Sequence, residues 1–214
     1  MKLKSLFASV LLAGISMLAQ AQEFPSLVEG KDYLKSQIKE TVVDANQKKP
    51  VLVEFFWYGC PHCFKMKPMA EKLSEKYNGK ITSVRYPVGF PNWESGARIF
   101  FTLEEMKLLD KLHSKTFEEI QVSRVNILAD QTKRDSFFAA NGVDVKQFNS
   151  TYNSFSVSNK WNKAKNIVTS HKIEGSPVYA VYSGGYTYQV LPSLTGSYEK
   201  TIENLDKILA AKSK

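Results

Sequence analysis

The sequence predicts a mixed α/β fold in which an all-helical segment interrupts a unit of strands and helices. Residues 51–57 form an apolar run that contains a single charge, which is typical of a strand buried on both faces. Residues 178–190 contain two strand-like stretches separated by a glycine turn. Between them, residues 94–171 lose strand signals and show helical periodicity instead. The predicted order is therefore strand–helix–strand, helical insertion, hairpin–helix.

The first unit begins with the buried strand at 51–57. A helix is predicted over about 60–76, because an Asn-Gly pair at 78–79 stops it. Residues 81–86 alternate between apolar and polar side chains and predict the next strand. Residues 22–50 are of mixed character and predict no regular element.

The inserted segment and the end of the chain follow the same logic. Apolar residues recur at helical spacing from 97 to 112. Further helices are expected at about 114–121, 130–140, 144–150 and 153–170. A hairpin with strands at 178–182 and 186–190 comes next, and an amphipathic helix over 197–211 closes the chain.

The N-terminus predicts a secretory signal peptide over residues 1–21. Lys2 and Lys4 precede an apolar stretch from 6 to 18, and Ala19-Gln20-Ala21 forms an A-x-A cleavage site. A membrane anchor is the alternative, but the apolar stretch is shorter than the roughly 20 residues that cross a bilayer. We therefore expect export to the periplasm, a compartment that tolerates disulfides.

The composition excludes some classes of protein. The chain of 214 residues has a formal net charge of +8, and loss of the two lysines in residues 1–21 leaves +6. No stripe of Lys and Arg with interleaved aromatic residues is visible, so a nucleic-acid partner is not expected. A solvated basic surface explains the charge better.

The only two cysteines of the chain form the motif Cys60-Pro61-His62-Cys63, directly after the first strand. Thiol–disulfide exchange needs one accessible sulfur held as thiolate and a second sulfur close enough to resolve a mixed disulfide. The unpaired N–H groups at a helix start stabilise the first thiolate, and the second cysteine lies one turn further in. A buried strand that ends in C-x-x-C at a helix start is the sequence form of a thioredoxin-like redox site.

Two other uses of the cysteine pair are weaker. A structural zinc site needs four ligands, and the three histidines, His62, His113 and His171, are not spaced to complete one, so no metal is expected. A purely structural disulfide would close a loop too short to add much stability. The Cys60–Cys63 disulfide is then the redox group, and no separate cofactor is expected.

Several segments together resemble the DsbA family of periplasmic thiol–disulfide oxidoreductases, within the thioredoxin-like superfamily. They are Val53-Glu54-Phe55-Phe56, the C-P-H-C motif, Arg85-Tyr86-Pro87-Val88-Gly89-Phe90 with Trp93 after it, and Gly175-Ser176-Pro177. The resemblance runs from about 24 to 209. It implies a thioredoxin-like fold over 22–92 and 172–214, with an all-helical domain inserted at 93–171.

The resemblance also implies an activity and partners. The enzyme would donate its disulfide to unfolded exported proteins with free thiols, and a DsbB-like membrane quinone reductase would reoxidise it. We expect a monomer. A disulfide isomerase or reductase on the same fold is an alternative, although no extra dimerisation domain is visible. A non-catalytic periplasmic module, such as a peptide-holding chaperone or a metallochaperone, is another.

Within the motif, Cys60 is expected to be the nucleophilic and accepting sulfur and Cys63 its buried partner. Pro61 and His62 belong to the dipeptide that is typical of the family. His62 is expected to tune the Cys60 thiolate as a donor or positive charge, or else to be exposed without a role. The other two histidines are expected to be surface or satisfied helix residues.

The resemblance assigns Pro177 as a cis-proline in a loop against the motif, and not an ordinary trans-proline. The backbone of Ser176 would then pair with a bound peptide as a short added strand. Trp57 and Phe64, together with Tyr58, are expected to form an apolar rim for unfolded peptide.

Glu54 is the single charge of the first strand, and burial of a carboxylate is costly unless it is paired or protonated. We expect either a proton relay for Cys63, with Arg85 on the next strand as its partner, or a plain buried ion pair. Phe56 is expected in the core.

Overall fold

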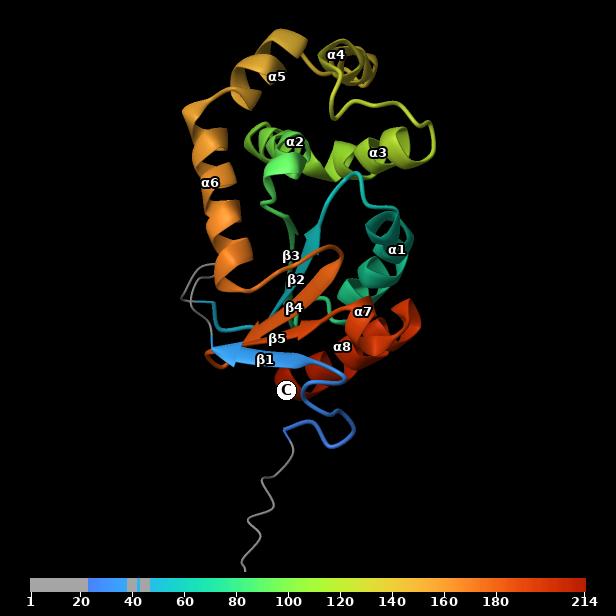
Figure 1. The fold of residues 1–214 in the computed structure, drawn as a ribbon, viewed down its shortest axis with the longest axis vertical. Coiled ribbons are helices and arrows are strands. Elements are labelled where there is room, and N and C mark those ends of the chain that lie inside the picture. Colours follow the sequence, from blue (N-terminus) through green and yellow to red (C-terminus); the bar gives the residue numbers. More distant parts are fainter. Residues whose placement is uncertain (1–22, 38–41, 43–46) are drawn as a thin grey trace, which may run out of the picture.

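The computed structural model describes residues 23–37, 42 and 47–214, so the predicted signal peptide lies outside the described residues. A central five-stranded sheet is surrounded by helices, with a block of helices at one end of the molecule (Figure 1). The strands are β1 (Leu34–Gln37), β2 (Val51–Phe56), β3 (Thr82–Pro87), β4 (Val178–Ser183) and β5 (Tyr186–Val190). The predicted mixed α/β fold is confirmed.

The sheet has the strand order β1-β5-β4-β2-β3. β2 pairs in parallel with β3 and antiparallel with β4, and the remaining pairs are antiparallel. Every residue of β2 is buried, as its continuous apolar run predicts. The register places Glu54 between Arg85 on β3 and Tyr179 on β4.

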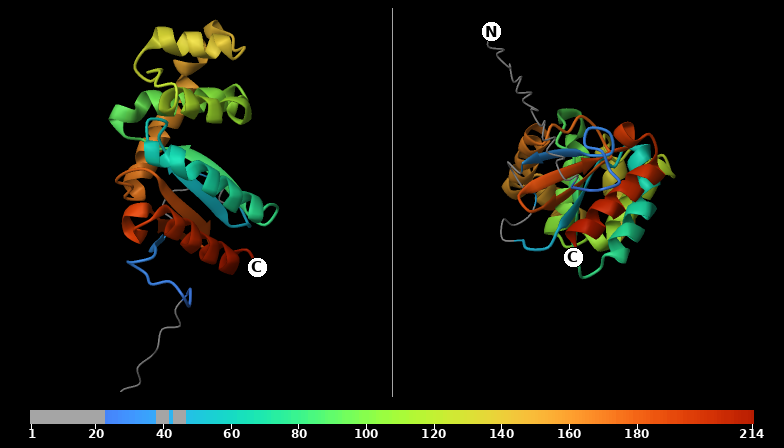
Figure 2. Two further views of the ribbon diagram at one scale, coloured as in Figure 1. Left: turned by 90° about the vertical axis from the view of Figure 1, so that its right-hand side faces the viewer. Right: turned by 90° about the horizontal axis from the view of Figure 1, so that it is seen from below.

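The two faces of the sheet are covered by different helices. Helices α1 (Pro61–Lys76) and α8 (Tyr198–Lys212) lie on one side, and α6 (Phe155–Ser170) lies on the other (Figures 1 and 2). Successive residues of β2 point to opposite faces, so Leu52 packs with the α1 and α8 side chains while Val53 packs with those of α6. The predicted helix after the first strand and the predicted C-terminal helix are both present.

The helical segment predicted over 94–171 is also present. It consists of the short 3-10 turn η1 (Pro91–Trp93) and the helices α2 (Glu94–Glu105), α3 (Leu109–Gln121), α4 (Gln131–Ala140), α5 (Val145–Tyr152) and α6. The boundary between the first two helices differs from the prediction. The periodicity predicts one helix through residue 112 and a new helix from 114.

The break instead falls at Lys107, which adopts a left-handed backbone with φ 57°. The N–H of Leu108 donates to the carbonyl of Leu103 at 2.7 Å, and that of Lys107 donates to Glu104 at 3.0 Å. These two bonds close α2 as a Schellman motif. Glycine usually occupies the left-handed position at such a helix end. Because Lys107 occupies it here, the sequence does not indicate that α2 ends at this point.

Besides the 3-10 turn η1, two elements were not predicted. β1 is a four-residue edge strand with mostly exposed side chains, and α7 (Pro192–Thr195) is a single turn. Neither is long enough to show a hydrophobic period. Within the described ranges, none of the helices combines the length and apolar character needed to cross a membrane.

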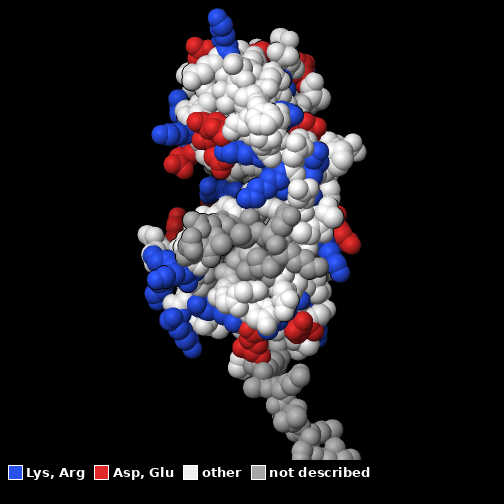
Figure 3. Space-filling model, turned by 90° about the vertical axis from the view of Figure 1, so that its left-hand side faces the viewer, with Lys and Arg blue, Asp and Glu red and all other residues white. Residues whose placement is uncertain are grey.

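Charges on the molecular surface are mixed. On the face shown in Figure 3, Lys and Arg side chains lie in separate groups among acidic and uncharged residues. Lys160 on α6, for example, pairs with Glu104 at 2.6 Å and Glu105 at 2.7 Å on α2. The basic groups visible on this face therefore do not form an uninterrupted stripe.

Candidate active site

The cysteine motif is positioned by the junction of β2 and α1. Cys60 is the N-cap of α1, and its sulfur accepts a hydrogen bond from the N–H of Cys63 at 3.3 Å. Pro61 opens the helix, where its missing N–H costs nothing and its fixed φ suits the first turn. Both cysteines are free thiols; Cys60 is 6% exposed and Cys63 is 0% exposed. The strand, the cap and the helix together leave Cys60 slightly exposed and bury Cys63 completely.

The two thiols have opposite acidities. The pKa of Cys60 is lowered to about 6, first by a hydrogen bond from the Cys63 thiol and then by the backbone N–H groups of Cys63 and His62. Burial raises the pKa of Cys63 far above its ordinary value, and the nearby Cys60 thiolate adds to this. The site therefore holds one thiolate and one thiol.

The loop before β4 lies against the motif. The Ser176–Pro177 peptide bond is cis, as the resemblance implies. The sulfur of Cys60 lies 3.4 Å from the carbonyl oxygen of Ser176, to which it can donate only in its protonated form, and Pro177 is buried. The structure thus brings Cys60, Cys63, Ser176 and Pro177 together, although 116 residues separate Cys60 from Ser176.

The ring of His62 is held by a residue that the sequence did not single out. Its Nδ1 forms a hydrogen bond with the hydroxyl of Tyr198, the first residue of α8. His62 is exposed, and its backbone N–H helps to lower the pKa of Cys60. A tyrosine far along the chain, at the start of an amphipathic helix, carried no signal for this contact.

A groove runs beside the motif. It has a volume of about 980 Å³, and its lining includes His62, Lys65, Ser176, Pro177 and Tyr198. Its walls come from the start of α1, the loop before β4 and the start of α8. Within the described ranges, no group of His, Cys, Asp and Glu side chains is arranged to hold a metal ion.

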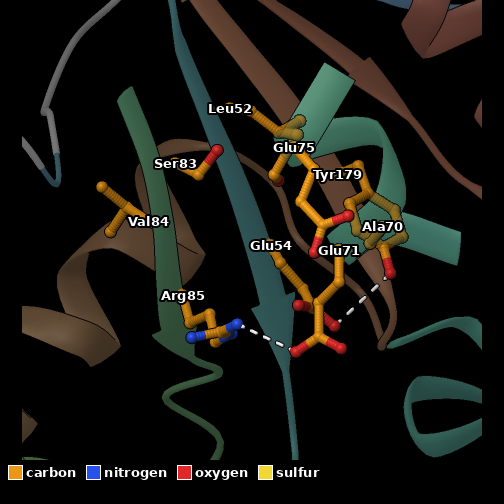
Figure 4. A pocket seen from close by; sticks show the side chains of 10 residues that line it. Leu52, Glu54, Ala70, Glu71, Glu75, Ser83, Val84, Arg85 and Tyr179 are labelled. Carbon is orange, nitrogen blue, oxygen red and sulfur yellow. Dashed lines mark hydrogen bonds and ion pairs between the residues drawn. The ribbon is translucent and has the colours of Figure 1, made fainter. Parts of the chain in front are cut away.

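Glu54 lies on the α1 side of β2, at a smaller cavity of about 290 Å³ (Figure 4). The expected ion pair with Arg85 is wrong. Arg85 pairs instead with Glu71 of α1 at 3.1 Å, and the partner of Glu54 is the hydroxyl of Tyr179, which donates to Oε1 at 3.4 Å. The parallel register sets Arg85 beside Glu54 in the sheet, but the helix above supplies a more exposed carboxylate for the guanidinium.

The acidity of Glu54 follows from its surroundings. Burial raises the pKa of its carboxyl to about 7, and the positive charge of Arg85 offsets only part of that effect. Burial raises the pKa of Tyr179 well above its ordinary value, and Glu54 and Cys63 raise it further, so this tyrosine lies within electrostatic reach of the carboxyl group and the buried thiol. The proton relay from Glu54 to Cys63 stays a prediction.

The aromatic residues near the motif divide into two groups. Trp57 is partly buried and stacks on Trp93, with ring centroids 4.6 Å apart and planes at 3°. Phe64 is also partly buried, and its ring centroid lies 6.1 Å from that of Phe117. Tyr58 is fully buried, so its predicted place in an apolar rim is wrong.

Phe56 is in the core, as predicted. Its ring packs against that of His113 on α3, with the ring centroids 5.1 Å apart. The hydroxyl of Tyr58 forms a 2.9 Å hydrogen bond with Nδ1 of His113. The side-chain amide of Gln121, also on α3, donates to the backbone carbonyl of Tyr58 at 2.8 Å. Two side chains of the helical segment therefore hold the loop that leads into Cys60.

The two other histidines are buried and bonded. His113 is bonded to Tyr58 as described, and burial lowers its pKa well below the ordinary value. Nε2 of His171 lies 3.3 Å from the hydroxyl of Tyr182. The expectation that these histidines are satisfied is confirmed, and the alternative that they lie at the surface is wrong.

Comparisons with known proteins agree with this geometry. Residues 31–88 match the Thioredoxin family model. The chain is 30% identical to the thiol:disulfide interchange protein DsbA of Pseudomonas aeruginosa, over 97% of this chain and 96% of that protein. It is 31% identical to the DsbA of Burkholderia cepacia, over 95% of each chain.

A solved structure is similar as well. The crystal structure of Pseudomonas aeruginosa DsbA matches with a TM-score of 0.73 and 32% identity, over 85% of this chain and 92% of that one. The shared fold is thioredoxin-like with a helical insertion. With the C-P-H-C motif at a helix start, the cis-proline loop and this similarity along most of its length, the chain belongs to the DsbA family of thiol:disulfide oxidoreductases.

Proposed function

We propose that this oxidoreductase donates its Cys60–Cys63 disulfide to thiols of newly exported, unfolded proteins. The observation that carries the proposal is the opposite acidity of the two sulfurs: the pKa of Cys60 is lowered to about 6, whereas that of Cys63 is raised. A sulfur with a low pKa is a good leaving group, and a stable thiolate favours the reduced form of the enzyme. An enzyme whose reduced form is favoured oxidises its substrates.

The reaction proceeds in two exchanges. A substrate thiolate attacks the sulfur of Cys60, the Cys60–Cys63 bond breaks, and its electron pair stays on Cys63, which takes up a proton as a buried thiol. A second substrate thiolate then attacks the substrate sulfur of the mixed disulfide, and Cys60 leaves as thiolate. Two electrons pass from the substrate thiols to the enzyme, and the substrate gains a disulfide.

The loop of Ser176 and Pro177 suits the role of a peptide-binding edge. The Ser176 carbonyl lies 3.4 Å from the Cys60 sulfur, so backbone groups of this loop lie beside the reacting atom. A peptide that pairs with them as a short strand would bring its own cysteine to Cys60. Trp57 and Phe64, both partly exposed near the motif, would contact apolar side chains of that peptide.

The cellular setting belongs to the same proposal. The protein would be exported by the signal peptide at 1–21, act as a periplasmic monomer, and be reoxidised by a DsbB-like membrane quinone reductase. Its working unit would be the thioredoxin-like domain of 22–92 and 172–214 with the helical domain of 93–171. No cofactor other than the disulfide is required.

A refolding assay tests the activity. The oxidised protein is mixed with a reduced, unfolded disulfide protein, and free thiols are counted over time. Substrate thiols should disappear with the wild-type protein and persist with Cys60→Ser. Cys63→Ser should also leave the substrate thiols intact, because a variant with a single cysteine has no disulfide to donate. Donation by Cys60→Ser would overturn the proposal, and binding of unfolded peptide without any exchange would favour a chaperone.

A further inference from the structure

The ring of His62 is tied to the C-terminal helix by Tyr198. The hydroxyl of Tyr198 and Nδ1 of His62 form a hydrogen bond, and the two ring centroids lie 6.0 Å apart with an interplanar angle of 57°. His62 is the second residue of α1, and Tyr198 is the first residue of α8. The bond thus joins the starts of two helices on either side of the groove beside Cys60.

A second contact fixes the tyrosine ring. The ammonium group of Lys65 lies 5.3 Å from the ring centroid of Tyr198. Lys65 follows His62 by three residues on α1, so both side chains lie on the same face of that helix. A cation over an aromatic ring attracts it. The ring of Tyr198 is therefore held at its face by Lys65 and at its hydroxyl by His62.

The hydrogen bond suits both charge states of His62. When the imidazole is neutral, the hydroxyl donates to Nδ1 and the ring proton resides on Nε2. When the imidazole is charged, Nδ1–H donates to the hydroxyl oxygen and Nε2 also carries a proton. In both states the bond holds the ring in one orientation, and we assign the neutral ring the Nε2–H tautomer, in which the Tyr198 hydroxyl is the donor.

The orientation of His62 matters to the redox sulfur through the backbone. The N–H groups of His62 and Cys63, the second and third residues of α1, stabilise the Cys60 thiolate. The side chain of His62 is exposed and has no support from a packed core. A tether from its ring to α8 restricts the first turn of α1 and keeps these two donors directed at the sulfur.

We propose that Tyr198 is a positioning residue of the redox site, which acts through His62 to stabilise the reduced Cys60 thiolate. The inference deepens the proposed disulfide donation and rests on it. Tyr198 touches neither sulfur in this account. Its hydroxyl sets the ring of His62, and His62 in turn sets the first turn of α1.

Tyr198→Phe removes the hydroxyl and keeps the ring with its Lys65 contact. The reaction to follow is enzyme disulfide plus two glutathione thiols giving enzyme dithiol plus glutathione disulfide. A typical hydrogen bond predicts a shift of about threefold to tenfold toward the enzyme disulfide in Tyr198→Phe. The apparent pKa of Cys60, followed by thiolate absorbance of the reduced protein, should rise with it.

A double-mutant cycle with His62→Ala separates positioning from simple packing. If Tyr198 acts through His62, adding Tyr198→Phe to His62→Ala should change the equilibrium by less than about 1.5-fold. Equal shifts in both backgrounds, or no shift in Tyr198→Phe alone, would overturn the inference. Tyr186→Phe is the matched control, because Lys35 lies 4.1 Å from its ring centroid and the residue is on β5, away from the motif. It should leave the equilibrium unchanged.

The imidazole nitrogens give a readout that does not depend on exchange. The chain contains three histidines, so ¹⁵N spectra of the reduced protein can be assigned with His62→Ala. At a pH where the ring is neutral, His62 should show Nε2–H alone in the wild type and a mixture of tautomers in Tyr198→Phe. A mixture in the wild type would contradict the inference even if disulfide donation is normal. Loss of donation with an intact Nε2–H form would instead count against the proposed function.

Discussion

At the scale of single residues, the environment gives each of the two identical thiols its own role. Cys60 caps a helix and receives hydrogen bonds from N–H groups and from the neighbouring thiol, whereas Cys63 is surrounded by core side chains. The C-x-x-C spacing predicts this difference because the second cysteine must lie one turn inside the helix.

The thiolate of Cys60 should be visible in a pH titration. Absorbance of the reduced protein at the thiolate band should rise with a midpoint near pH 6, because hydrogen bonds lower that pKa, and Cys63 should add no second step at its ordinary pKa because burial raises it. Cys60→Ser should abolish the step. A lowered pKa stabilises the folded reduced protein above the ordinary thiol pKa, and this gain is lost as the pH falls through about 6. A midpoint near 8.5, the ordinary thiol value, would refute the description of the site.

Glu54 should make stability depend on pH in the opposite sense. Its pKa is raised to about 7 by burial, so its contribution is full below its ordinary value of 4.5 and is lost as the pH rises through 7. Glu54→Gln should therefore be more stable than the wild type by about 2–3 kcal/mol at pH 8 and equal to it at pH 4. Chemical unfolding at the two pH values measures this. A variant that is less stable at pH 8 would show that the carboxylate is well paired.

At the scale of elements, the hydrophobic periodicity of the sequence predicted most of the helices and strands correctly. The buried run of β2, the hairpin of β4 and β5, and the amphipathic α8 all follow their sequence patterns. The end of α2 did not, because Lys107 takes a backbone conformation that usually requires glycine. Short edges such as β1 lack enough residues for a pattern, and their structure depends on pairing with a distant strand.

Some features of the site could also be predicted from the sequence, and others could not. Cys60, Cys63 and the cis bond at Pro177 follow from a local motif or from a family resemblance. The pairing of Arg85 with Glu71, and that of His62 with Tyr198, depends on how helices sit over the sheet. A sequence pattern fixes which face a side chain occupies. It does not fix which of several nearby partners a charged or polar group selects.

Gly89, two residues after the end of β3, tests how closely the loop after that strand packs against α6. A Cβ at this position would lie 2.4 Å from backbone atoms of Ala164 and Lys165 in α6, and backbone cannot move aside as a flexible side chain can. Gly89→Ala should therefore destabilise the protein by about 1–3 kcal/mol in chemical unfolding. Gly175→Ala is the control, because a Cβ there meets nothing within 4 Å. Equal stability of the two variants would contradict the close approach of the segment after β3 to α6.

At the scale of the whole molecule, the helical segment and the sheet share one core. The side chains of β2 that face α6 continue into those of α2 and α3 without interruption. His113 and Gln121 extend this connection to the loop before Cys60 through Tyr58. The helical segment therefore packs against the loop that precedes Cys60. The side chains between the sheet and helices α1 and α8 form a separate apolar cluster on the opposite face of the sheet.

The measurement that tests the central claim most directly is the equilibrium of Cys60–Cys63 in graded glutathione buffers. Trp57 reports the state of the pair by fluorescence, because its ring packs over Gly59, the residue before Cys60. A disulfide-donating enzyme with a stabilised Cys60 thiolate should stay reduced until the buffer is strongly oxidising. If the pair instead stays oxidised deep into reducing buffer, the disulfide is the stable form, and disulfide donation is contradicted.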